Sequence, residues 1–220
     1  RKWANKELKK QLYEYVTKKY GATPLVHCCG LGNLSDCKAM IGIGNYNVNK
    51  RNKFGFTALI SASLKDHDHI VEYLLQLPNV DINIKNADGG TALSWAIQNG
   101  NTKLTKLFCE RKHVDVNANV NDEYFFYPSL TEHSKYCYAN LRLYRNYGSS
   151  ALPLPALLTA MNYHRGHNYD DIVKYLVKKF LNKGVTKKHV NEAYMLAHKN
   201  GHILLEEFFS TTLLSFEDKK

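Results

Sequence analysis

The sequence predicts an all-α solenoid in which short helix-turn-helix units stack on one another. Two residue types carry the period, because a threonine and an asparagine each recur every 34 residues along the first half of the chain. These residues are Thr23, Thr57 and Thr91, with Asn49, Asn83 and Asn117. Two coincident periods of this length are typical of repeat proteins, whose single units cannot bury their apolar faces alone.

The start of each unit predicts a short first helix. Residues 57–59 and 91–93 both read Thr-Ala-Leu, and a threonine side chain can cap the first turn of a helix. In the first unit Pro24 follows Thr23, and proline at the first helical position already has a helical φ. Small residues such as Ala62 then keep the first helix narrow, so that neighbouring units can stack closely.

The second half of each unit predicts a second, amphipathic helix. Ile70, Val71, Leu74 and Leu75 stand at positions i, i+1, i+4 and i+5, which places them along one side of a helix. Gly100 marks the end of the first helix in the third unit, where glycine commonly terminates helices.

These segments resemble the ankyrin repeat, which opens on Gly-x-Thr-Pro-Leu-His, continues with two short helices and closes on Asp-Val-Asn. Gly55 and Gly89 stand two residues before their threonines, and residues 81–83 and 115–117 supply the close as Asp-Ile-Asn and Asp-Val-Asn. The resemblance covers residues 20–119 strongly. It implies a stack that binds partner proteins through its hairpin tips and through the concave face of its first helices.

The remaining segments are less regular. Residues 1–20 are expected to form an N-terminal capping helix before the three clear repeats of residues 21–119. Residues 120–149 are rich in tyrosine and break the period, which predicts an irregular insertion. Residues 150–220 are expected to form degenerate repeats with a C-terminal cap. An apolar run at 172–177 predicts a second helix, preceded by a turn that extends to residue 171. Residues 197–205 resemble a terminal unit.

Composition sets the class of partner and of compartment. Lys plus Arg is 30 and Asp plus Glu is 20, so the formal net charge is +10, which favours an acidic partner. The chain holds 5 cysteines at irregular spacing, which argues against a disulfide framework and predicts an intracellular, cytoplasmic protein. No run of 18 apolar residues occurs, so no membrane span is expected. We expect a monomer.

Recognisable catalytic chemistry is absent from the sequence. It holds no P-loop, G-x-G-x-x-G, H-E-x-x-H or G-x-S-x-G motif, and no neighbourhood marks a Cys/His nucleophile, so we expect neither an enzyme nor a cofactor. Cys28, Cys29 and Cys37 suggest a metal, but adjacent cysteines do not have the spacing of structural zinc sites. Because two of them occupy small positions of the first helix, packing is the predicted role and no metal is expected.

The residues expected to bind a partner lie at hairpin tips and at the ends of first helices. Phe54 and Phe56 are the predicted apolar anchors beside Arg51 and Lys53, since clustered aromatic and basic residues have the composition of binding hot spots. The alternative is that one of the two phenylalanines packs on the adjacent unit. The full predicted set is Arg51, Lys53, Phe54, Phe56, Leu64, Lys65, Lys85, Asp88, Gln98 and Asn99.

Three further hypotheses accompany this one. The basic and aromatic tip could instead bind nucleic acid, although most positive pairs are spread along the chain. Degenerate repeats in an Asn-, Lys- and Tyr-rich chain resemble ankyrin proteins of intracellular bacteria or large viruses, which implies an effector that binds a host protein. Leu75, followed after five residues by Asp81-Ile82-Asn83, resembles the motif of an asparaginyl hydroxylase, with Asn83 as the acceptor; hairpin hydrogen bonding is the alternative role for Asn83.

Overall fold

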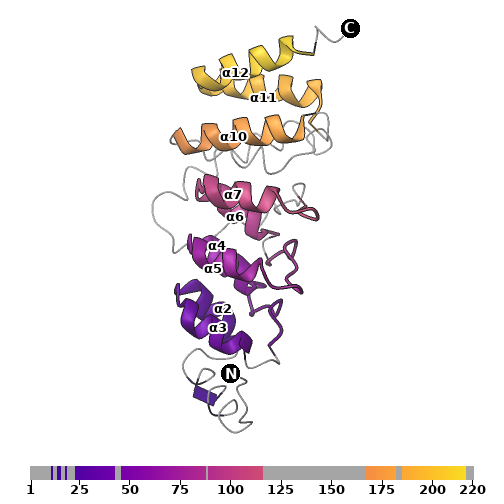
Figure 1. Ribbon diagram of the computed structural model, residues 1–220. Helices are drawn as coiled ribbons and strands as arrows, with labels where there is room; N and C mark the ends of the chain where they lie inside the picture. The colour runs from indigo at the N-terminus through magenta and orange to yellow at the C-terminus, as the bar shows by residue number, and fades with distance from the viewer. Residues whose placement is uncertain are drawn as a thin grey trace.

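The computed structural model describes residues 11, 14, 15, 18, 23–42, 46–87, 89–115, 167–181 and 185–216. Within these residues the regular structure is helical, apart from an isolated bridge between Leu181 and Val185. The helices are α2 (Pro24–Gly30), α3 (Leu34–Gly42), α4 (Ala58–Leu64), α5 (Asp68–Leu74), α6 (Ala92–Gln98), α7 (Thr102–Cys109), α10 (His167–Phe180), α11 (Lys187–Asn200) and α12 (Ile203–Leu214). They stack into an elongated solenoid (Figure 1), so the predicted all-α solenoid is confirmed.

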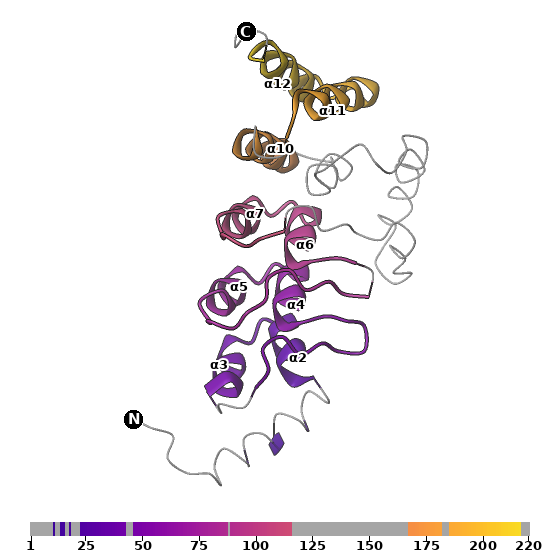
Figure 2. The ribbon, with the colours of Figure 1, turned by 90° about the vertical axis from the view of Figure 1, so that its right-hand side faces the viewer.

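The helices form two columns. Figure 2 shows the first helices α2, α4 and α6 in one column and the second helices α3, α5 and α7 in the other, with the hairpin tips projecting beside the first column. Contacts between α2 and α4, and between α4 and α6, join consecutive units. Further along, α10 packs on α7 and α12 packs on α10 and α11, which extends the stack toward the C-terminus.

Threonine caps fix the start of two first helices. The Thr57 side chain accepts a hydrogen bond from the Ile60 backbone N–H at 3.3 Å. Thr91 and Ser94 form a reciprocal pair, in which each side chain accepts from the other's backbone N–H, at 3.2 and 2.8 Å. Caps of this kind stabilise a helix by about 1 kcal/mol each. Thr23 makes no such bond, and Pro24 follows it at the first helical position, where its ring already fixes a helical φ.

The apolar core runs between the two columns. Small residues of the first helices, such as Ala62 and Ala96, are fully buried, and this lets their backbones approach closely. The largest fully buried side chains come mainly from second helices, including Leu74, Phe108 and Phe209. Each second helix thus closes the core of its unit.

The closing asparagines tie each unit to the next. The Asn49 side chain donates to the Asn79 carbonyl at 2.7 Å and accepts from the Asp81 backbone N–H at 3.0 Å. One period later Asn83 donates to the His113 carbonyl and accepts from the Asp115 N–H, both at 2.7 Å. The recurrence of these bonds explains why asparagine repeats every 34 residues.

A left-handed residue follows each first helix. Gly32 has φ +77° and Gly100 has φ +70°, and the equivalent residue of the middle unit is Asp66, with φ +55°. Among non-glycine residues in the described part of the chain, Asp66 is the one with a positive φ. The turn therefore imposes a conformation that glycine adopts more readily than aspartate.

The C-terminal helices correct one sequence prediction. Helix α10 begins at His167, so the turn expected to extend to residue 171 is wrong. Tyr169 anchors this polar segment to the third unit: its hydroxyl donates to the Gln98 carbonyl at 2.6 Å, and its ring lies against Gly100. Residues 120–149 and most of residues 1–20 lie outside the described residues, so the insertion and the capping helix stay predictions.

Candidate functional site

The tip of the second unit, residues 51–56, is a tight hairpin locked by one asparagine. The Asn52 side-chain oxygen accepts from the backbone N–H groups of Phe54 and Phe56, each at 2.9 Å. The Asn52 N–H donates to the Phe56 carbonyl, and the Gly55 N–H donates to the Asn52 carbonyl, also at 2.9 Å. These bonds leave little freedom to the backbone that presents the tip side chains.

The tip also rests on the tip of the third unit. The Ala87 N–H donates to the Phe54 carbonyl at 3.0 Å. Gly55 has φ +78°, and a Cβ there would lie 2.6 Å from the Ala87 nitrogen and 2.9 Å from the Asn86 carbonyl carbon. Only glycine fits this close approach of two backbones. Because Asn86 closes its own tip by accepting from the Gly90 N–H at 2.7 Å, the two hairpins support each other.

One aromatic ring and two cations occupy the outer side of this tip. Phe54 is 48% exposed, and the Lys53 ammonium lies 4.8 Å from the centroid of its ring, within the range of a cation–π contact. Arg51 is exposed, and its Nε donates to the Gly55 carbonyl at 3.3 Å. The tip therefore presents an exposed aromatic ring with one cation over it, at Lys53, and a second exposed cation at Arg51 in the same hairpin.

Phe56 corrects the prediction that both phenylalanines are surface anchors. It is 6% exposed, and its ring lies 6.2 Å, centroid to centroid, from that of Trp95 in the third unit. Phe56 thus packs one unit against the next and is not available to a partner. Phe54 alone keeps the expected exposure.

The predicted residues at the ends of the first helices differ in whether their side chains make hydrogen bonds within the protein. Lys65 is exposed and Leu64 is half-buried. The Asn99 amide donates to the carbonyls of Ser63 and Leu64, at 3.1 and 3.0 Å, so it satisfies the last carbonyls of α4. Asn99 therefore has a structural role that its position did not reveal.

The other predicted positions are less informative. Lys85 is exposed at the third tip, and Gln98 is half-buried with its backbone carbonyl bonded to Tyr169. Asp88 lies outside the described residues. Asn83, the predicted hydroxylation acceptor, is half-buried, and both ends of its side-chain amide are engaged with the third unit. Hairpin hydrogen bonding is thus present at Asn83, and its hydroxylation stays a prediction.

The structure also brings together three cysteines that sequence reasoning treated as packing residues. Cys28, Cys29 and Cys37 are fully buried, and their sulfurs all lie within 4.8 Å of one another. Among the described residues they form the one group of three or more His, Cys, Asp or Glu side chains able to hold a metal ion. The spacing of eight residues between Cys29 and Cys37 could have indicated this cluster, because the chain turns back within that distance and places Cys37 on the neighbouring helix.

Comparison with known proteins decides the family. The sequence matches the family model described as ankyrin repeats (3 copies) over residues 3–86 and 28–122, which together span more than half of the chain. The chain belongs to the ankyrin-repeat family. Ankyrin repeats are general protein–protein interaction modules, and this is the functional class of the chain.

Comparison of structures agrees on the fold. The crystal structure of EF0377, an ankyrin repeat protein, aligns with a TM-score of 0.63 and 21% sequence identity, over 93% of this ankyrin-repeat chain and 89% of that one. Among curated protein sequences, none matches the chain. None of the helices in the described part of the ankyrin stack combines the length and the apolar character needed to cross a membrane.

Proposed function

We propose that this ankyrin-repeat chain is a non-catalytic scaffold that binds a partner protein with an acidic surface, chiefly through the tip formed by Arg51, Lys53 and Phe54. The observation that supports it is the exposed Phe54 ring on a hydrogen-bonded hairpin that also carries the exposed cations Arg51 and Lys53. Large aromatic side chains dominate the binding energy of many interfaces, and truncating such a hot spot to alanine costs 2 kcal/mol or more.

Rigidity of the tip favours binding. Association costs free energy when it immobilises loops and side chains, and a loop that is already ordered avoids part of this cost. The Asn52 hydrogen bonds and the close approach of Gly55 to Ala87 order the tip before any partner arrives. The anchor is therefore presented in one backbone conformation.

The charges around the tip favour an acidic partner. Arg51, Lys53, Lys65 and Lys85 are all exposed, on a chain with a net charge of +10. Complementary charge mainly speeds the encounter, and salt screens it over a Debye length of about 8 Å at 0.15 M. We expect the association rate to fall with salt, while the loss of Phe54 raises the dissociation rate.

The test compares capture of proteins from a nuclease-treated lysate by the wild type and by two variants. Lys53→Ala with Phe54→Asp gives the second tip the residues that the third tip carries at positions 87 and 88, so the hairpin should be kept. Met195→Ala is the matched control, because Met195 is also apolar and 58% exposed but lies on α11. We expect one protein to be retained by the wild type and the control and lost by the tip variant.

Two results would contradict the proposal. Equal retention by wild type and tip variant would remove the tip as the site. Capture that requires intact nucleic acid and falls steeply with salt would instead support nucleic-acid binding.

An intracellular site of action is supported by the cysteines at 28, 29, 37 and 109, which are free and buried. A role as an effector acting on a host protein rests on the sequence resemblance, and the identity of the captured protein tests it.

A further inference from the structure

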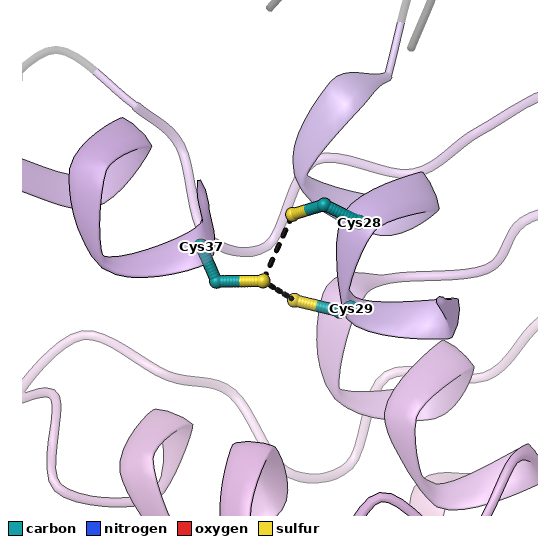
Figure 3. A group of neighbouring side chains, drawn as sticks. All are labelled: Cys28, Cys29 and Cys37. Carbon is teal, nitrogen blue, oxygen red and sulfur yellow. Dashed lines mark hydrogen bonds between the residues drawn. The ribbon is translucent and has the colours of Figure 1, made fainter. Parts of the chain in front are cut away.

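The three buried cysteines converge on one point between the first two helices of the stack. Figure 3 shows Cys28 and Cys29 on α2 pointing toward Cys37, which projects from α3. The Cys37 sulfur lies 2.8 Å from that of Cys28 and 3.1 Å from that of Cys29. All three side chains have 0% exposure. The arrangement is a closed triangle of thiols inside the protein.

Packing alone does not explain why these residues are cysteines. The repeat places Ala62 and Ala96 at the position of Cys28, and both are fully buried in their own units. The position of Cys37 is occupied by Val71 in the second unit and Thr105 in the third, which are also fully buried. The same fold thus fills the positions of Cys28 and Cys37 without sulfur, so packing does not require cysteine at either of them.

Hydrogen bonds within the triangle shift the pKa values of its thiols in opposite directions. Hydrogen bonds from Cys28 and then from Cys29 lower the pKa of Cys37 well below its usual value, against the opposing effect of burial. The pKa of Cys29 is raised by its hydrogen bonds with Cys28 and Cys37 and by burial. Thiolates are the metal-binding form of cysteine, so a metal that binds at this triangle must displace the thiol protons.

We propose that Cys28, Cys29 and Cys37 bind one monovalent copper ion, Cu(I), in a three-coordinate thiolate site. Soft thiolate ligands select Cu(I), zinc and iron–sulfur clusters among biological metals. Zinc takes four ligands in structural sites, but no fourth His, Cys, Asp or Glu joins the group among the described residues. A soft ion that accepts three sulfurs is what this donor set fits.

Binding requires a small local adjustment. Three sulfurs at about 2.3 Å from one ion stand about 4 Å apart, whereas the two shorter separations here are 2.8 and 3.1 Å. Binding therefore requires each of these two separations to open by about 1 Å. Each thiol that becomes a ligand releases its proton to water, and the ion stays Cu(I) throughout.

The experiment titrates reduced, metal-free protein with Cu(I) without oxygen, against a coloured Cu(I) chelator. We expect the wild type to withdraw one Cu(I) per chain, and X-ray absorption to show three sulfur neighbours. Cys37→Val and Cys28→Ala should lose this withdrawal, and Val71 and Ala62 show that the fold accepts these residues. Cys109→Ala, at a buried cysteine on α7, should keep it. Affinity should fall as the pH is lowered from 8 to 6, because protons compete with the metal for the thiolate ligands.

Several outcomes would overturn the proposal. The first is a wild-type protein that leaves all the copper with the chelator. The second is a Cys37→Val variant that binds Cu(I) as well as the wild type does, when circular dichroism shows that both are folded. The third is a site that binds zinc with four ligands but does not bind Cu(I). A disulfide between Cys37 and either neighbour that persists in the reduced protein would also exclude it, because its thiols would then be unavailable.

Discussion

Replacing Phe56 by alanine should destabilise the stack, whereas the same change two residues earlier should not. Phe56 is 6% exposed and packs on Trp95 across the interface between the second and third units. Buried Phe→Ala substitutions cost about 3–5 kcal/mol, from lost burial and the cavity that remains. Because Phe56 lies at the base of a surface hairpin, where neighbours can partly collapse, we expect about 3 kcal/mol.

Thermal unfolding followed by circular dichroism measures this difference. For a chain of this size, 1 kcal/mol corresponds to about 2–4 °C in Tm, so Phe56→Ala should lower Tm by about 6–12 °C. Phe54→Ala is the matched control, because Phe54 is 48% exposed and surface substitutions usually change stability by about 0.5 kcal/mol or less. Its Tm should stay within about 2 °C of the wild type.

The reasoning would be refuted by a Phe56→Ala protein that melts within about 2 °C of the wild type. Phe56 would then contribute no packing, and its assignment as a structural residue would have to be withdrawn. A Phe54→Ala protein that loses as much stability as Phe56→Ala would be equally damaging, because binding losses in that variant could no longer be separated from unfolding.

Four other experiments, three with substitutions and one by mass spectrometry, test the remaining arguments. Asn83→Ala removes two inter-unit hydrogen bonds and should lower the free energy of unfolding, measured in urea, by about 1–2 kcal/mol. An unchanged free energy of unfolding would show that hydrogen bonds to water replace these two bonds without loss of stability. Mass spectrometry should find one added oxygen on the Asn83 peptide when the chain is made in a cell that contains the asparaginyl hydroxylase, and an unmodified peptide there ends that hypothesis. Asp66→Gly should be more stable than Asp66→Ala by about 1 kcal/mol in the same urea assay, because φ is +55° at this position; equal stability would deny a conformational cost. Tyr169→Phe removes the hydroxyl that donates to Gln98, so amides of α10 should exchange faster with solvent while those of α4 do not, and unchanged exchange in α10 would contradict its anchoring role.

The period of the sequence was enough to predict the fold because its signals are local. Thr57 and Thr91 cap first helices as expected, since a cap depends on residues within one turn. Hairpin hydrogen bonding was the structural role expected for Asn83, and the structure shows such bonds to the following unit at both Asn49 and Asn83. Helix α10 was partly missed because its first turn is polar and its anchor, Tyr169, acts on a residue far back in the chain.

Side-chain direction at the tip could not be predicted from spacing. Phe54 and Phe56 stand two apart, and in an extended strand they would point to the same side. Gly55 between them has φ +78°, which breaks this alternation and turns one ring outward and the other into the stack. The sequence shows the glycine, but the outcome depends on the backbone of the third unit at Ala87.

The repeats act as an internal control that separates scaffold from function. Where the units agree, the structure shows a recurring hydrogen bond, at the capping residues Thr57 and Thr91 and at the closing residues Asn49 and Asn83. Where the units differ, the fold accepts more than one residue type at the position, so the residue found there can serve a function other than folding. Phe54, which has Asp88 as its counterpart, and Cys37, which has Val71, are both of this second kind. Because one scaffold accepts both members of each pair, exchanging them within the chain tests function at the smallest cost to stability.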